Sequence, residues 1–458
     1  MAPNLSLFSF HYIISTTPIV IYFIDVDFYI EVIYNMRTLR IGMRGTDVME
    51  IQSLLQILGY YKGALDRIFG TQMRNAVIAF QRNFGLTADG VIGPATFRVM
   101  EKYLLGYDTY AIKPGDTFYK ISQRYFTSLP RILAANPNLD PMRLQVGQQI
   151  IIPYGIDVVQ TNIDYTYEIM ERDIRGLKVR YPFLETGVAG KSVLGKNLYY
   201  IRLGRGTNQV FYNGAHHALE WITTPLLMKF LENFAKAYVD GRNIKGYNPR
   251  EIFNQSSIYI IPMVNPDGVN LVLDGLSRDN PYYSRLIRWN NGSTSFSRNW
   301  EANIRGVDLN HNYDALFYEY KEVAETMGIT GPGPRRYPGP GPESEPESKA
   351  VADFTRNHNF RLVLAYHSQG EVIYWNFQNM APPEARQIGQ QFARASGYIL
   401  DEPTGAASYS GYKDWFIQQY RRPGYTIEVG RGTNPLPISQ FPEIYRDNEE
   451  ILLLAAIV

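Results

Sequence analysis

The first region with a clear hydrophobic pattern predicts a small helical domain. Apolar residues recur at helical spacing in two blocks, Val48–Leu58 and Ala76–Phe84. A turn-rich segment, Gly59–Gly70, separates the blocks. We therefore expect a helical domain over residues 37–106.

The pattern changes in the next segment. Tyr110–Pro153 combines a short strand, a Pro-Gly-Asp turn, two helical stretches and a closing apolar strand. This order predicts a small βααβ domain over residues 108–154. We interpret the following segment, Tyr154–Asp164, as a linker.

The remaining region, residues 160–458, alternates helical stretches with short apolar runs. Two of these runs are Leu198–Leu203 and Phe360–Tyr366. Such alternation predicts an α/β domain with a mixed or parallel sheet. Gly328–Ser348 interrupts the pattern with Pro and Gly but no periodicity. We expect this segment to be a long loop at the rim of an active-site cleft.

Composition narrows the classes of function. A chain of 458 residues exceeds the size of one hydrophobic core, so several domains are expected. The 45 Lys and Arg nearly balance the 44 Asp and Glu, which argues against a nucleic-acid partner. Cysteine is absent, which excludes disulfides, Cys-ligated metals and thiol nucleophiles.

Residues 1–36 form an apolar segment of uncertain role. Asp25, Asp27 and Glu31 interrupt its apolar run, which is too short and too charged to span a bilayer comfortably. A basic start and a small-residue cleavage site are not evident, so it is a poor secretory signal. We expect a leader or an unstructured segment, and no stable membrane insertion.

Two histidines and a glutamate are candidate metal ligands. His217 and Glu220 lie three residues apart near a predicted helix start, so their side chains share one face. His367 follows the apolar strand Leu362–Tyr366, at a position where open α/β sheets bind ligands. Two His and one Glu leave a fourth zinc position open, which is typical of catalytic sites, although cobalt and manganese also accept these ligands. The His-x-x-Glu pattern alone also occurs as an ordinary solvated contact.

The N-terminal regions resemble two wall-binding families. The helical region resembles the three-helix peptidoglycan-binding domain through Gly45, Asp47-Val48, Gln52, Gly59-Tyr60, Asp66, Phe69-Gly70, Ala79-Phe80-Gln81 and Asp89–Thr96. The βααβ region resembles a LysM domain through Tyr110–Thr117, Ile132–Pro137 and Leu144–Gln148. LysM domains bind glycans that contain N-acetylglucosamine, so the resemblance implies peptidoglycan as a partner. A helical spacer is the alternative for the first region.

The α/β region resembles the zinc carboxypeptidase family. The matching motifs, in order, are Gly214–Thr223, Asn265–Gly268, Gly306–Asn310, His367-Ser368, Asp414-Trp415 and Thr426–Glu428. The resemblance implies a mixed eight-stranded sheet flanked by helices, with one Zn²⁺ held by His217, Glu220 and His367. Within the family, the region is most similar to bacterial γ-D-glutamyl-meso-diaminopimelate peptidases, through Trp300–Asn310, Tyr337–Pro340 and Gly411–Ile417.

The resemblance also implies roles for three further residues. Glu428 matches the catalytic glutamate that moves the proton, and a surface carboxylate is the alternative. Arg305 is our choice for stabilising the oxyanion, with Arg298 second, although either arginine could form a structural salt bridge. Asp308 matches the acidic partner that orients the first histidine, and a helix cap is the alternative.

The chain departs from the family in its substrate-binding residues. Carboxypeptidases hold the terminal carboxylate with an Asn-Arg pair, but here His311 follows Asn310. Loss of the arginine favours cleavage within, or beside, a branched stem peptide. Ala406 takes the place of the family's mobile tyrosine, which leaves Tyr409 or Tyr412 as substitutes. Lys413 matches the specificity-pocket residue and would suit an anionic side chain, unless it faces solvent.

Together these features predict a zinc peptidase of the bacterial cell wall. The predicted reaction is hydrolysis of the γ-D-glutamyl–diamino acid bond in peptidoglycan stem peptides, with the N-terminal domains bound to glycan strands. The alternatives are a carboxypeptidase that trims peptide C-termini and a non-catalytic wall-binding protein. We expect extracytoplasmic action at the cell wall or on spores, and sporulation is among the stages that the sequence leaves open.

Overall fold

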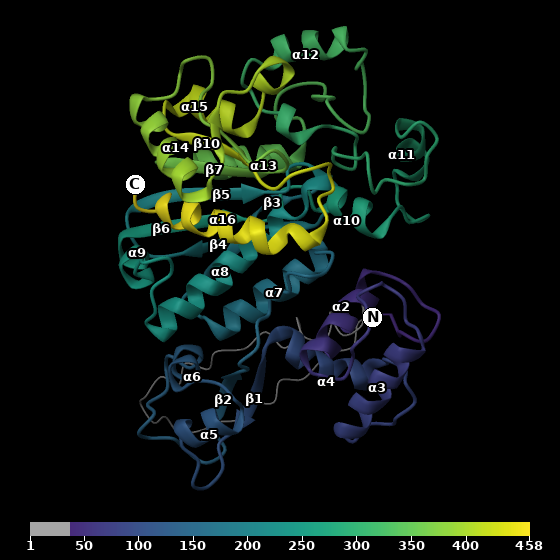
Figure 1. Ribbon diagram of the computed structural model, residues 1–458, viewed down its shortest axis with the longest axis vertical. Helices are drawn as coiled ribbons and strands as arrows, with labels where there is room; N and C mark the ends of the chain where they lie inside the picture. Colours follow the sequence, from purple (N-terminus) through teal and green to yellow (C-terminus); the bar gives the residue numbers. More distant parts are fainter. Residues whose placement is uncertain (1–36) are drawn as a thin grey trace, which may run out of the picture. The chain divides into compact units, whose positions relative to one another are not determined.

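The computed structural model describes residues 37–458 (Figure 1). The predicted leader, residues 1–36, lies outside the described residues. No helix within residues 37–458 is long and apolar enough to cross a membrane.

Three helices form the N-terminal domain: α2 (Thr46–Ile57), α3 (Thr71–Asn83) and α4 (Pro94–Leu105). Two buried glutamines hold the turns that follow α2 and α3. Gln52 donates to the Asp66 carboxylate at 2.7 Å, and Gln81 donates to the Asp89 carboxylate at 2.9 Å. Buried amides need such partners, so the Gln and Asp positions seen in the sequence are turn-stabilising pairs.

The second domain is the predicted βααβ unit. It contains β1 (Tyr107–Ala111), α5 (Phe118–Arg124), α6 (Leu129–Ala135) and β2 (Gln149–Pro153). The two strands pair antiparallel. Thr117 and Ser128 cap the two helices by accepting hydrogen bonds from the backbone N–H of Lys120 and Arg131. An isoleucine-rich core fills the space between helices and strands.

The largest domain is built on an eight-stranded mixed sheet, in the order β3-β4-β6-β5-β7-β10-β8-β9. The strands are β3 (Glu185–Lys191), β4 (Asn197–Leu203), β5 (Asn208–Gly214), β6 (Ser256–Ile261), β7 (Leu362–His367), β8 (Val372–Tyr374), β9 (Ile399–Asp401) and β10 (Gly424–Glu428). The four central strands, β6, β5, β7 and β10, are parallel, and their outer neighbours β4 and β8 run antiparallel to them. At the edges, β3 pairs antiparallel with β4 and β9 pairs parallel with β8. This confirms the predicted mixed eight-stranded sheet.

Helices cover both faces of the sheet (Figure 1). They are α7 (Tyr167–Arg180), α8 (Thr223–Asp240), α9 (Pro249–Gln255), α10 (Pro266–Asp274), α11 (Tyr283–Trp289), α12 (Phe317–Thr326), α13 (Pro346–Arg356), α14 (Pro383–Ser396), α15 (Tyr412–Tyr420) and α16 (Phe441–Leu454). Alternate residues of β5 enter two cores: Val210 and Tyr212 pack with α7, α8 and α16, whereas Phe211 packs with α13 and α15. Burial on both faces explains why adjacent residues in the middle of the central strands, such as Val210, Phe211 and Tyr212, are all apolar or aromatic.

The segment Tyr154–Asp164, which we predicted to be a linker, is packed into the large domain. Val158, Val159 and Ile163 are buried in its core. The backbone N–H groups of Val158 and Val159 donate to the Glu232 carboxylate on α8. This segment is therefore an integral part of the domain, because three of its apolar residues are buried and two of its backbone donors have a buried partner.

Two close contacts connect α7 with the helical domain. Arg172 on α7 forms an ion pair with Glu50 on α2. Gly176 packs directly against the end of α4, where an added Cβ would lie 2.5 Å from the Leu105 carbonyl oxygen. Only glycine fits this position without displacing backbone.

Candidate active site and metal centre

The carboxyl ends of the central parallel strands bring the predicted site together. β5 ends at Gly214, β7 ends at His367, and β10 ends at Glu428. Glu428 lies directly opposite His367 in the register of β10 and β7. Parallel strands end at one edge of a sheet, which is where α/β proteins bind their ligands.

A tight turn after β5 presents the first two candidate ligands. His217 precedes a short 3₁₀ segment, η1 (Ala218–Glu220). The Thr223 hydroxyl accepts a hydrogen bond from the Ala215 N–H at 2.9 Å and donates to the Glu220 carbonyl at 2.8 Å. These two bonds close the turn, so His217 and Glu220 emerge on the same side.

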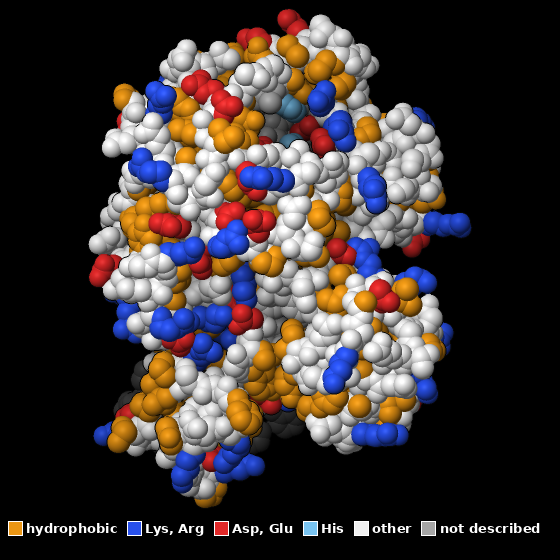
Figure 2. Space-filling view, in the orientation of Figure 1, with side chains coloured by type: hydrophobic (Ala, Val, Ile, Leu, Met, Phe, Trp, Pro, Cys, Tyr) orange, Lys and Arg blue, Asp and Glu red, His pale blue; other side chains and the backbone are white. Residues whose placement is uncertain are grey.

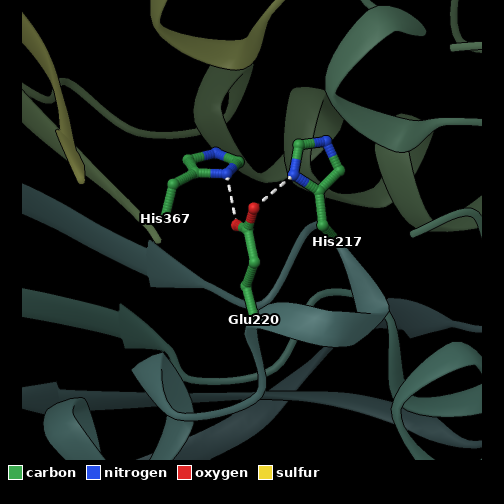
Figure 3. Close-up of side chains that lie close together, drawn as sticks. All are labelled: His217, Glu220 and His367. Carbon is green, nitrogen blue, oxygen red and sulfur yellow. Dashed lines mark hydrogen bonds and ion pairs between the residues drawn. The ribbon is translucent and has the colours of Figure 1, made fainter. Parts of the chain in front are cut away.

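The three predicted ligands converge on one point (Figure 3). The Nδ1 atom of His217 lies 2.9 Å from Glu220 Oε1, and His367 Nδ1 lies 2.8 Å from Glu220 Oε2. One ligand atom from each residue lies within 4.8 Å of the other two. Two imidazole nitrogens and a carboxylate, all directed inward, fit a zinc ion with one position left for a further ligand. The zinc carboxypeptidase family uses this metal, as predicted.

The site is strongly polarised by its own charges. Burial opposes the charge on Glu220, but His217 and His367 outweigh it and hold the pKa of this carboxyl below its ordinary value. Burial also opposes the charge on His217, yet Glu220 and Asp308 raise the pKa of its imidazole well above the ordinary value. Positive charge is thus favoured where a cation would sit.

Asp308 lies behind His217, as expected for an orienting residue. Its Oδ1 is 3.1 Å from His217 Nε2, the nitrogen that faces away from Glu220. The same carboxylate caps η2 (Leu309–His311) through the Asn310 N–H, and its Oδ2 accepts from the Arg336 N–H at 2.8 Å. Asp308 therefore makes both the contact with His217 and the helix cap.

The predicted loop contributes to this support. No regular element occurs between residues 328 and 345, and α13 begins at Pro346. The Tyr337 carbonyl accepts from the Asp308 N–H at 2.7 Å. The loop therefore holds Asp308 through two hydrogen bonds, one to the Asp308 backbone N–H and one to the Asp308 carboxylate.

A small cavity opens beside the candidate ligands. It has a volume of about 130 Å³ and is lined by, among others, His217, Asn310, His311, Tyr409, Lys413 and Glu428. Figure 2 shows histidine side chains inside a hollow of the surface, with acidic side chains beside them. Burial, followed by the nearby Glu220 carboxylate, raises the pKa of Glu428 well above its ordinary value. A raised pKa makes the Glu428 carboxylate a stronger base, which is the property that proton transfer from water requires.

Two of the predicted substrate-binding residues have internal partners. Tyr412 is fully buried in the core, and its hydroxyl lies 2.9 Å from the Thr355 hydroxyl. Tyr412 is thus unable to contact a substrate, which corrects the sequence-based expectation and leaves Tyr409 in the cavity. Lys413 is 3% exposed and pairs with Asp414 at 2.6 Å, so it is not a solvent-facing lysine.

The arginines predicted to stabilise an oxyanion are not joined to the ligand cluster. Arg305 pairs with Glu345 at 3.6 Å, its side chain is 42% exposed, and Arg298 is also exposed. Sequence reasoning missed Arg335, which pairs at 3.5 Å with Glu301. Burial raises the pKa of Glu301, whereas the charge of His217, the first candidate ligand, lowers it. The Arg335–Glu301 pair is therefore close enough to His217 for their charges to interact.

Asn434 is a second residue that sequence reasoning missed. Its amide donates to the Ser368 carbonyl and approaches Glu220 Oε1 at 3.4 Å. No motif marks this residue, because it reaches Glu220 through tertiary packing alone.

Three families match the chain in the predicted order. The zinc carboxypeptidase family matches residues 170–451, the peptidoglycan binding domain matches 44–100, and the LysM domain matches 110–153. A solved structure of thrombin activatable fibrinolysis inhibitor covers 77% of this chain and 97% of its own, with a TM-score of 0.50 and 16% identity. That likeness supports the fold.

Two curated bacterial proteins are more similar in sequence. Gamma-D-glutamyl-L-diamino acid endopeptidase 1 of Lysinibacillus sphaericus is 43% identical over 395 residues, which cover 75% of this chain and 98% of the relative. The protein YqgT of Bacillus subtilis is 36% identical over 290 residues, which cover 63% of this chain and 76% of the relative. With the ligand geometry in place and the family matching more than half of its length, the chain belongs to the zinc carboxypeptidase family.

Proposed function

We propose that this protein is a zinc peptidase that hydrolyses the γ-D-glutamyl–diamino acid bond of peptidoglycan stem peptides. The observation that carries the proposal is the convergence of His217, Glu220 and His367 beside Glu428, in a chain 43% identical to an endopeptidase of that specificity. A non-catalytic wall binder would have no need to keep this buried, charge-balanced group intact.

The residues of the site divide the chemistry among them. A zinc ion held by His217, Glu220 and His367 would supply a Lewis acid that polarises a carbonyl and lowers the pKa of water. Glu428 takes the proton from the attacking water and passes it to the leaving nitrogen. Asp308 keeps the His217 ring in the tautomer and orientation that ligation needs.

The stabilising cation for the oxyanion is assigned to Arg305 as a proposal. Its ion pair with Glu345 is long, at 3.6 Å, and its own side chain is 42% exposed, which supports a guanidinium that can turn toward a substrate. Arg335 is the competing candidate, because it already pairs with Glu301 near His217.

The N-terminal domains would hold the enzyme at its substrate. The peptidoglycan binding domain family matches the first domain and the LysM family matches the second, which supports association with the cell wall. Tethering raises the local concentration of stem peptides at the active site without any new contact in the site itself. We propose action outside the cytoplasm, with spores as one setting.

The test combines metal content with product analysis. Purified protein is assayed for zinc, then incubated with defined tri-, tetra- and pentapeptide muropeptides, and the products are identified by mass spectrometry. The proposal expects about one zinc per chain and release of fragments that begin at the diamino acid. Release of only C-terminal amino acids would instead identify a carboxypeptidase, and wall binding without any release would identify a silent binder.

Glu428→Gln is the decisive variant. It keeps the size of the side chain but removes the proton acceptor. We therefore expect kcat to fall by about 10²- to 10⁴-fold while zinc is retained. Glu443→Gln, at an exposed position on α16, is the matched control and should retain full activity. Normal turnover by Glu428→Gln would refute the assigned role.

A further inference from the structure

The neighbouring residues Asn310 and His311 form a paired recognition element. Both lie on η2, and both line the cavity beside Glu428. Each side chain has one polar atom that hydrogen-bonds to the backbone of Tyr409 or Tyr412. That bond decides whether the other polar atom of the side chain is a donor or an acceptor.

Asn310 is left with its donor end. Its Oδ1 accepts a hydrogen bond from the Tyr412 N–H at 3.1 Å. Because a backbone N–H can only donate, the amide orientation is set and the Nδ2 group remains to donate. Within residues 37–458, the only other hydrogen bond of Asn310 is made by its own backbone N–H, to Asp308.

His311 is left with its acceptor end. Its Nδ1 lies 3.0 Å from the Tyr409 carbonyl, which can only accept, so Nδ1 carries the proton. In a neutral ring, Nε2 then presents a lone pair. The ring stacks on Tyr320 with centroids 3.9 Å apart and planes 9° from parallel, which holds its plane in place. Burial also lowers the pKa of His311, which favours the neutral form.

We propose that Asn310 and His311 together bind an amide group on the leaving side of the scissile bond, and that they discriminate against a free carboxylate there. An amide offers a carbonyl to Asn310 and an N–H to His311. A carboxylate offers only acceptors, so one of its oxygens would face the lone pair of His311. This inference rests on the proposed function and deepens it. The preferred stem peptide either continues beyond the diamino acid or carries an amide at the carboxyl of that residue next to the scissile bond.

The primary test compares two substrates on the unaltered, zinc-loaded protein. One is L-Ala-γ-D-Glu-diaminopimelate with a free carboxylate on the diaminopimelate centre next to the scissile bond. The other carries a primary carboxamide at that carboxyl. The inference expects kcat/KM to be about 5- to 100-fold higher for the carboxamide, the range expected for one mismatched buried hydrogen bond. Equal values, or a preference for the carboxylate, would overturn it.

Two variants separate the roles of the pair. His311→Arg replaces the lone pair with a cation and should abolish or reverse the preference. Asn310→Ala removes a donor that serves both substrates, so it should weaken both while keeping the preference. Melting temperatures check that each variant folds. A preference unchanged in His311→Arg would refute the assignment of His311.

A binding measurement separates this inference from the proposed function. Calorimetry compares binding of free diaminopimelate and of its carboxamide to the zinc-loaded protein, without any cleavage. If γ-D-glutamyl peptides are not cut but the carboxamide still binds more tightly, and His311→Arg removes that difference, then the proposed function fails while the recognition element stands. Equal binding of both compounds contradicts the recognition element.

Discussion

Glu347 is a buried carboxyl whose ionisation should oppose folding. It lies on α13, where its two oxygens accept from the Val193 N–H at 3.0 Å and from the Asn303 amide at 3.2 Å. Burial, only partly offset by these bonds, raises its pKa from 4.5 to about 7. Asn303 in turn holds the turn before Asp308 by accepting from the Arg305 and Val307 N–H groups.

The sign of the effect follows from linkage between folding and protonation. Below pH 4.5 the carboxyl is protonated in both states and has no influence. Between pH 4.5 and about 7 the unfolded chain ionises while the folded protein does not, so stability falls as pH rises. Above about pH 7 both states are ionised and the loss is constant. At about 1.4 kcal/mol for each pH unit, the difference corresponds to about 3 kcal/mol.

Glu347→Gln tests this reasoning. Gln cannot ionise, so the stability of the variant relative to the original protein should rise by about 3 kcal/mol between pH 4.5 and pH 8. Urea unfolding of the zinc-loaded proteins, followed by tryptophan fluorescence at several pH values, measures the difference. Glu443→Gln, on the surface, should show no such trend. A difference for Glu347→Gln that stays the same from pH 4.5 to pH 8 would refute the buried-carboxyl argument.

Three further outcomes are expected. Asp308→Asn should weaken zinc binding by about 10- to 100-fold, measured by competition with a chelator, because the His217 ring loses its charged partner. Arg305→Ala should lower kcat more than Arg335→Ala if Arg305 stabilises the oxyanion, and the reverse order would transfer that role to Arg335. Gly176→Ala should lower the free energy of unfolding by about 1–3 kcal/mol, because its methyl group would collide with the Leu105 carbonyl. Limited proteolysis should then cleave the segment between α4 and α7 faster, and an unchanged cleavage rate would contradict the close contact.

The sequence by itself determined the features that depend on local pattern and on ligand chemistry. Alternating apolar runs and helices predicted the mixed sheet, because burial on both faces of a strand imposes its own composition. The spacing of His217 and Glu220, with His367 at a strand end, predicted the ligand group, because strand ends and short turns direct side chains in known ways.

Tertiary structure decided which of the remaining polar residues reach the site. Tyr412 looked available from its motif, but packing places it in the core against Thr355, whereas Asn434 carries no motif and yet approaches Glu220. Part of the predicted linker is also buried, and the Val158 N–H in it donates a hydrogen bond to the Glu232 carboxylate on α8. In each case the decisive contact joins residues far apart in the chain, and the hydrophobic pattern of one segment contains no information about which distant segment will cover it.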